Sequence, residues 1–112
     1  MAVEPDRTTL RQSIGDIAPK LVELSEQVLF GDIWERPELN KRDRSLITVS
    51  ALVALGRSEQ LHFHIPRALE NGVSEAELVE VITHLAFYSG WPTSMTAIKI
   101  AKEIFTMHNR KN

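Results

Sequence analysis

Residues 42–64, RDRSLITVSALVALGRSEQLHFH, decide the fold that we predict for this chain. Between residues 46 and 55 only two residues are polar, and both are small. At about 100° per residue the apolar side chains of this segment point all round a helix, which is typical of a buried helix. We therefore predict a central helix over residues 43–55, ended by Gly56 in the position of a C-terminal glycine cap.

Apolar residues on either side of the central helix recur at helical spacing, and no stretch alternates as a strand does. The sequence therefore predicts an all-α fold with short loops. The further helices are expected at residues 6–13 (capped by Asp6), 19–30, 58–71 (capped by Ser58), 75–89 and 92–107.

Local signals refine three places along the chain. Residues 31–40 read as a loop in which Trp34 packs as a buried anchor. Pro66 removes a backbone donor inside a predicted helix, so we expect a kink or break near residues 62–65. Ser74 and Glu77 match a capping box and predict a helix start.

The composition favours one soluble domain over residues 1–112. The formal net charge is −2, which gives no reason to expect nucleic-acid binding. The chain has no cysteine, so disulfides and thiolate chemistry are excluded. We recognise no signal peptide, and no apolar run approaches the roughly 20 residues that span a bilayer. A cytoplasmic protein without a membrane partner is the expectation.

A polar stripe after the central helix is the first candidate site. Arg57, Gln60, His64 and Arg67 are spaced by three and four residues, which places them on one side of a helix. The stripe brings a titratable imidazole near two cations and near a helix N-terminus, where anions are favoured. It predicts an anion-binding pocket with His64 as acid or base. The alternative is a polar face exposed to water.

A second candidate lies on the next helix, where Glu80, His84 and Tyr88 follow one another at intervals of four residues. Such a ladder can form hydrogen bonds and offers two proton-transfer groups. The alternative is again a solvated helix face.

The sequence gives little support for a metal or nucleotide site. His62 and His64 are two residues apart, so a helix does not place their imidazoles side by side, and we predict no metal. The chain also lacks a phosphate-cradling glycine loop, a G-x-S-x-G motif and a dinucleotide fingerprint.

Several stretches, taken in their order and spacing, resemble the carboxymuconolactone decarboxylase family over about residues 31–105. The resemblance implies a compact all-α fold that is usually assembled into trimers or hexamers, so a homotrimer or homohexamer is expected. The stretches are DIWERPEL at 32–39, RSLITV at 44–49, ALVALGR at 51–57, EQL at 59–61 with His64, ALENGV at 68–73, ELVEV at 77–81 and AFYSGWP at 86–92.

The wider superfamily includes alkylhydroperoxidase D-like proteins, which carry C-x-x-C followed four residues later by His. Aligning that His with His64 places Arg57 and Gln60 at the cysteine positions. Since the attacking species in such enzymes is a thiolate, we expect no thiol peroxidase activity. In the decarboxylase branch the matching polar positions are His64 and Glu59.

This resemblance implies decarboxylation of a small carboxylated lactone in aromatic catabolism. Loss of CO₂ from the γ carbon of a butenolide pushes electrons into the lactone carbonyl, so the substrate is its own electron sink and no cofactor is expected. The protein must hold two carboxylates, stabilise charge on the lactone oxygen and protonate the α carbon. The candidates for binding substrate are Arg44, Arg57, Gln60, Arg67 and His84, and the catalytic candidates are His64, Tyr88 and Glu59.

Two other functions remain open at this point. A cysteine-free relative might have been expected to catalyse another proton transfer on a small acid. A different class is a non-catalytic oligomeric protein that binds a small acid and has lost the reaction. A pocket shared by His64 and His84 would favour an enzyme, whereas two histidines far from any cleft would favour the binding protein.

Overall fold

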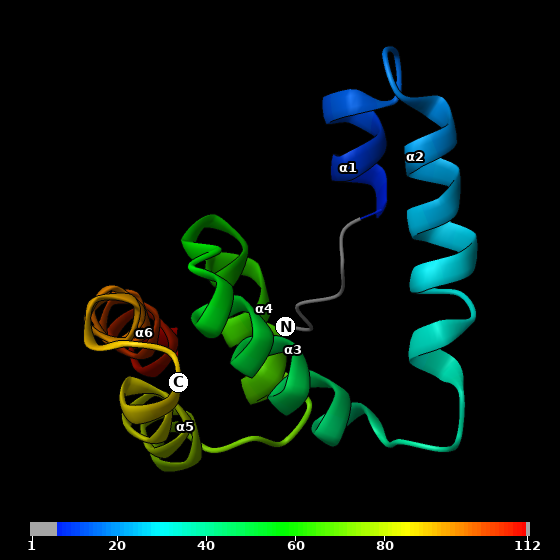
Figure 1. The fold of residues 1–112 in the computed structure, drawn as a ribbon. Coiled ribbons are helices and arrows are strands. Elements are labelled where there is room, and N and C mark those ends of the chain that lie inside the picture. Colours follow the sequence, from blue (N-terminus) through cyan, green and yellow to red (C-terminus); the bar gives the residue numbers. More distant parts are fainter. Residues whose placement is uncertain (1–6, 112) are drawn as a thin grey trace. The chain divides into compact units, whose positions relative to one another are not determined.

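A computed structural model describes residues 7–111 of the chain, and within them every regular element is helical, as predicted (Figure 1). The chain divides into an N-terminal unit, residues 1–41, and a C-terminal unit, residues 42–112. The single domain predicted over residues 1–112 spans both units and stays a prediction. The elements are α1 (Arg7–Ile14), α2 (Pro19–Glu23), the π-helix η1 (Leu24–Leu29), the 3₁₀-helix η2 (Ile33–Glu35), α3 (Lys41–Leu55), α4 (Ser58–Glu70), α5 (Glu75–Tyr88) and α6 (Trp91–Lys111).

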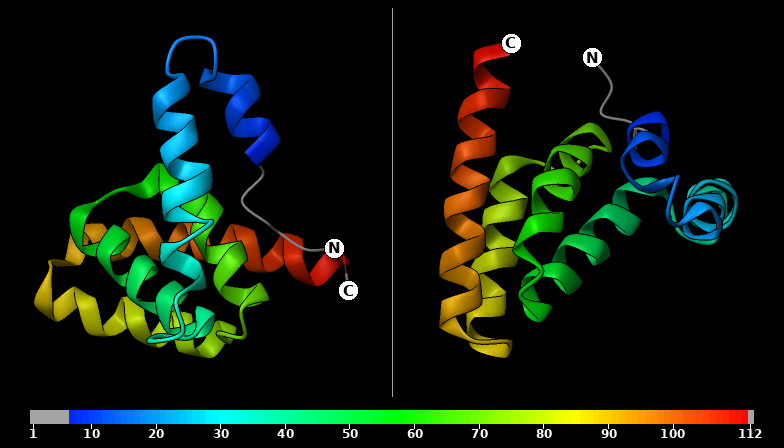
Figure 2. Two further views of the ribbon diagram at one scale, coloured as in Figure 1. Left: turned by 90° about the vertical axis from the view of Figure 1, so that its right-hand side faces the viewer. Right: turned by 90° about the horizontal axis from the view of Figure 1, so that it is seen from above.

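The N-terminal unit pairs α1 with the longer α2–η1 segment (Figure 2). Pro19 occupies the first turn of α2, as predicted, because a residue at that position needs no amide hydrogen. The second half of the predicted helix is wound as a π-helix rather than an α-helix. Trp34 is buried, as predicted, and its ring lies 6.2 Å from that of Phe30. Asp6, the predicted cap of α1, lies outside the described residues.

Helix α3 begins two residues before its predicted start and ends at the predicted residue, Leu55. It contributes Val49 and Val53 to the hydrophobic core. The predicted burial on every side is wrong for the described chain, since Ile47 is 55% exposed and Leu55 is 67% exposed. The physical reason is that a unit of four helices has too few neighbours to surround one of its own members.

Helix α4 departs from prediction at its start and at its proline. Arg57, not Ser58, is the N-cap residue, and no side chain caps the helix. Gly56 before it has φ +71°, a left-handed conformation that favours glycine at the end of α3. The predicted break at Pro66 is also wrong, because α4 is continuous through it. The carbonyl that loses its donor belongs to His62, which is exposed, so water can satisfy it.

Helices α5 and α6 form an antiparallel pair, and α4 packs against α6 (Figures 1 and 2). The Ser94 hydroxyl donates to the carbonyl of Ile82 at 2.9 Å, which joins α6 to α5. Ala97 and Ala101 are fully buried, and their small side chains let α6 lie close to its neighbours. The core of the unit is Val49, Val53, Leu61, Ile65, Ala68, Val73, Leu78, Ile82, Ala97, Ile100 and Ala101.

The predicted capping box at the start of α5 is confirmed. The Glu77 amide donates to the Ser74 hydroxyl at 3.0 Å, and the Ser74 amide donates to the Glu77 carboxylate at 2.9 Å. This amide, together with the charge of Arg42, lowers the pKa of Glu77 below its usual value. The box therefore holds a carboxylate at the positive end of the α5 dipole.

Ser74→Ala is expected to lower the free energy of unfolding by about 1 kcal/mol, because one amide of the first turn of α5 loses its cap. Urea unfolding measures the change. Thr83→Ala is the matched control, since the Thr83 hydroxyl is exposed and only donates back to a carbonyl of the same helix. The control should stay within about 0.5 kcal/mol of the parent. Equal losses in the two variants would contradict a capping role for Ser74.

Among residues 7–111, none of the helices combines the length and the apolar character that crossing a bilayer requires.

Candidate functional site

Three members of the first predicted stripe lie on α4 at the expected helical spacing. Gln60 is exposed, His64 is half-buried and Arg67 is only 6% exposed. The Nδ1 atom of His64 and the Nε atom of Arg67 are both shielded from solvent. Burial of an arginine is unusual, because moving a permanent charge out of water is costly. The stripe therefore passes from a hydrated residue to a permanent positive charge in the interior.

His64 is the imidazole that this environment changes. Its burial, and second the positive charge of Arg67, lower the pKa of His64 from 6.5 to about 4. At neutral pH about one His64 side chain in a thousand then carries a proton. The group is ready to accept a proton, and an anion placed beside it would favour its protonated form.

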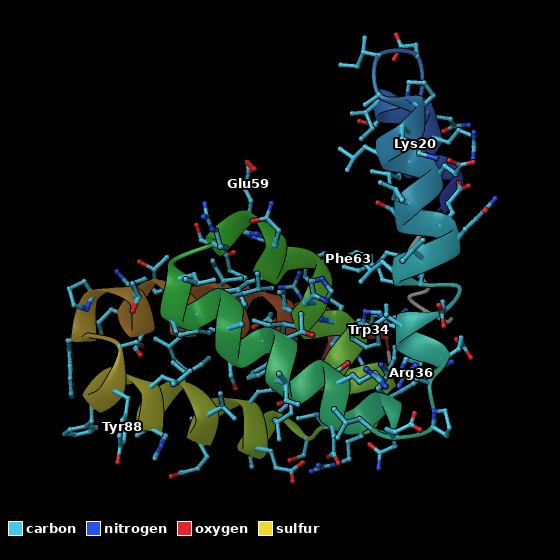
Figure 3. The ribbon with its side chains drawn as sticks, turned by 45° about the vertical axis from the view of Figure 1, so that its right-hand side comes forward. Lys20, Trp34, Arg36, Glu59, Phe63 and Tyr88 are labelled. Atoms are coloured by element: carbon cyan, nitrogen blue, oxygen red, sulfur yellow. The ribbon has the colours of Figure 1, made fainter. Side chains whose placement is uncertain are left out.

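The first residues of the predicted site lie at the far end of α4. Arg57 is the N-cap residue and Glu59 lies in the first turn, and both are exposed. Figure 3 shows the Glu59 side chain pointing outward from this end of the helix. Ten residues separate Arg57 from Arg67, which corresponds to about 15 Å along a helix axis. The fold thus separates two arginines that the sequence pattern places on one stripe.

Arg44 lies at the same end of the C-terminal unit as Arg67. Ser45, beside Arg44 in the first half of α3, is fully buried, and its Oγ accepts a hydrogen bond from Asn71 Nδ2 at 2.9 Å. Asn71 follows α4 directly, one turn after Arg67. This contact holds the start of α3 beside the end of α4. Sequence reasoning missed Ser45 and Asn71, whose pairing across 26 positions leaves no local signal.

The second predicted stripe lies on α5, where the rings of His84 and Tyr88 stack with centroids 4.6 Å apart and planes 22° apart. Tyr88 is 78% exposed at the C-terminal end of the helix (Figure 3). His84 opens onto a shallow hollow of about 340 Å³ between α3 and α5. The hollow is lined by Leu46, Ser50, Glu77, Glu80, Val81, His84 and Leu85.

His64 does not line the hollow at His84. The two predicted stripes therefore do not share this hollow in the described part of the chain. Glu77 and Glu80 also give the hollow two acidic side chains, which disfavour an anionic ligand. The end of α4 with Arg67 and the nearby Arg44 is the better place for an acid, and it is where the neutral His64 lies.

No group of three or more His, Asp or Glu side chains within residues 7–111 is arranged to hold a metal ion. The predicted site residues fall instead into three separate places. These are the end of α4 with His64, Arg67 and Arg44, the start of α4 with Arg57, Glu59 and Gln60, and the C-terminal half of α5 with His84 and Tyr88.

Comparison with known proteins gives a consistent result. The model of the carboxymuconolactone decarboxylase family matches residues 19–103, which includes parts of both units. The chain is 35% identical over 94 residues to 4-carboxymuconolactone decarboxylase of Acinetobacter baylyi, covering 84% of this chain and 70% of that protein. It is 32% identical over 81 residues to nitrosuccinic acid decarboxylase npaB of Metarhizium robertsii, covering 72% of this chain and 57% of that protein.

A third relative is an uncharacterized 15.0 kDa protein of Paracoccus denitrificans, 27% identical over 81 residues. This match covers 70% of the present chain and 60% of that protein. The chain therefore spans less than two thirds of the length of the second and third relatives.

Proposed function

The chain belongs to the carboxymuconolactone decarboxylase family, and on that premise we propose that it is a cofactor-independent decarboxylase of a small carboxylated lactone. The observation that carries the proposal beyond similarity is the neutral, half-buried His64 beside the buried cation of Arg67. An interior cation attracts a carboxylate, and an imidazole of low pKa gains a proton when that carboxylate arrives. Both properties suit the release of CO₂ from an acid followed by protonation of carbon.

The two curated decarboxylases among the relatives support a carboxy-lyase. Their names describe substrates with one feature in common, an acid that also carries an electron-withdrawing group. In the lactone the electrons left by CO₂ pass to the ring carbonyl, and in a nitro acid they pass to the nitro group. A nitro-substituted dicarboxylic acid is therefore the second candidate substrate for this chain.

We assign Arg67 and Arg44 to the two carboxylates of the substrate. Both lie toward the end of the C-terminal unit that the Ser45–Asn71 hydrogen bond fixes, whereas Arg57 lies about 15 Å along α4. An arginine at this position holds a carboxylate through paired hydrogen bonds and also stabilises negative charge that forms on the lactone oxygen. Gln60 is the next group along the stripe and is available to a longer substrate.

The reaction then needs one bond to break and one to form. The bond between the γ carbon and its carboxylate breaks, CO₂ leaves, and the electron pair moves through the ring alkene to the lactone oxygen. His64, protonated after the dianion has bound, delivers its proton to the α carbon, and water restores that proton. Under this proposal Glu59 and Tyr88, which lie on other parts of the C-terminal unit, act only if a second subunit brings them to His64.

Assembly into a homotrimer or homohexamer is part of the proposal. The exposed side of α3, with Ile47 and Leu55, supports it, because apolar side chains of this size gain stability when another subunit covers them.

Release of CO₂ from 4-carboxymuconolactone by the purified protein tests the function, and Arg67→Met tests the site. Loss of the buried cation is expected to raise KM at least about 10-fold, the usual scale for one charge-assisted hydrogen bond. Arg57→Met, the matched control at the exposed start of α4, should leave KM within about twofold. A similar KM in all three proteins would refute the assignment of Arg67, and absence of CO₂ release from both acids would refute the function.

The protein is also expected to show no dithiol-dependent hydroperoxidase activity, because it has no cysteine to supply the attacking thiolate. The assay follows consumption of an organic hydroperoxide in the presence of a dithiol donor, with an alkylhydroperoxidase D-like protein that carries C-x-x-C as the positive control. Turnover by the pure chain above the rate without protein would contradict this prediction.

A further inference from the structure

Large apolar side chains gather where α5 turns into α6. Phe87 is 75% exposed, Tyr88 78%, Trp91 57% and Met95 45%, and we call these four residues the aromatic corner. The rings of Phe87 and Trp91 meet edge to face with centroids 5.6 Å apart. Gly90 between the helices has φ +115°, which allows this turn. Figure 3 shows Tyr88 projecting outward at this place.

The exposed area is large for a chain of this size. An aromatic side chain presents roughly 150–250 Å² when it is fully accessible, so the three rings at their exposed fractions leave about 400 Å² of mostly apolar surface in water. Such an area falls within the range of the largest apolar patches on monomers, which often mark contact sites. It is also about half of what one partner contributes to a standard protein interface. The aromatic corner therefore has the size of an interface core.

The charge pattern points to the identity of the partner. Residues 85–98, LAFYSGWPTSMTAI, contain no Asp, Glu, Lys or Arg. A partner chosen through charge, such as a nucleic acid or a charged peptide, would find no complementary group there. Across a two-fold axis, by contrast, each residue near the axis faces its own copy, and a surface without charge avoids like-charge repulsion.

We propose that the aromatic corner is the contact between two copies of this chain, related by a two-fold axis that passes near Tyr88 and Trp91. This contact would bury the rings against their own counterparts, and edge-to-face pairs such as that of Phe87 and Trp91 are the geometry that aromatic contacts prefer. The inference does not depend on decarboxylase activity, and it concerns a surface other than the end of α4.

Light scattering on the full chain tests the contact through two charged variants. Phe87→Asp and Trp91→Asp would place like charges opposite each other at the axis, so each should lower the mass measured for the parent at micromolar concentration. Met107→Asp is the matched control, because Met107 is on the same helix and 59% exposed but lies about 24 Å along its axis. The control should keep the parent mass. Circular dichroism checks that the variants fold.

A single cysteine tests the symmetry, because the chain has no other thiol. Tyr88→Cys treated with a short bis-maleimide should give a covalent dimer, whereas Met107→Cys should stay largely monomeric on a denaturing gel. A monomeric parent, or a mass that both aspartates leave unchanged, would overturn the proposal. A lowered mass without cross-linking at Tyr88→Cys would overturn the two-fold axis at this position.

Discussion

His64→Gln is expected to lower turnover of the lactone about 100-fold or more, the usual scale for loss of a general acid or base. Glutamine keeps a polar side chain of similar size but cannot carry a proton between water and the substrate. Because His64 lies beside the buried Arg67, which would still bind the carboxylate, KM should change much less than kcat. Steady-state CO₂ release over a range of substrate concentrations separates the two constants.

His62→Gln is the control for this experiment, since His62 lies on the same helix but is exposed. It should retain the parent turnover, and melting curves of both variants show whether the fold is intact. If His64→Gln leaves turnover unchanged, the proton must pass through another group, and His84 with Tyr88 is the next candidate. If turnover and melting temperature fall together by a large amount, His64 has a structural role.

The free energy of unfolding is expected to fall by up to about 3 kcal/mol between pH 6.5 and pH 4 because of His64 alone. In the folded chain the pKa of this imidazole is about 4, whereas its ordinary value is 6.5. Between these two values the unfolded chain binds more protons than the folded chain, so acid favours unfolding. The contribution is complete above pH 6.5 and is lost as the pH falls through 6.5 toward 4.

Urea unfolding of the parent and of His64→Gln at several pH values measures this contribution by difference. The subtraction is needed because Glu77, whose pKa is lowered by Ser74 and Arg42, also costs stability once the pH drops below its usual value near 4.5. The two curves should converge as the pH is lowered from 6.5 to 4. Parallel curves over this range would contradict a depressed pKa for His64.

Local patterns in the sequence predicted most of the helices. The capping box at Ser74 and Glu77 and the glycine after α3 depend on neighbours within four residues, so the sequence contains the whole signal. The same reasoning failed at Ser58 and at Pro66. A cap depends on which residue first leaves the helical conformation, and a proline is tolerated where its lost partner is hydrated.

The site was less predictable because burial and long-range contacts decide it. Helical spacing identified His64 and Arg67 together, but it gave no sign that Arg67 would be buried, since arginine is usually exposed. The position of Arg44 follows from the Ser45–Asn71 hydrogen bond between segments far apart in the chain. Spacing alone likewise grouped Arg57 with Arg67, although the length of α4 separates them.

The open side of α3 bears on how the stability of this chain is measured. When a second subunit covers Ile47 and Leu55, association adds to the free energy that holds each chain folded. The melting temperature then rises with protein concentration, because dilution removes the cover before the core comes apart. Stabilities of variants are therefore comparable only at one protein concentration, and the slope of melting temperature against that concentration becomes a property of the protein itself.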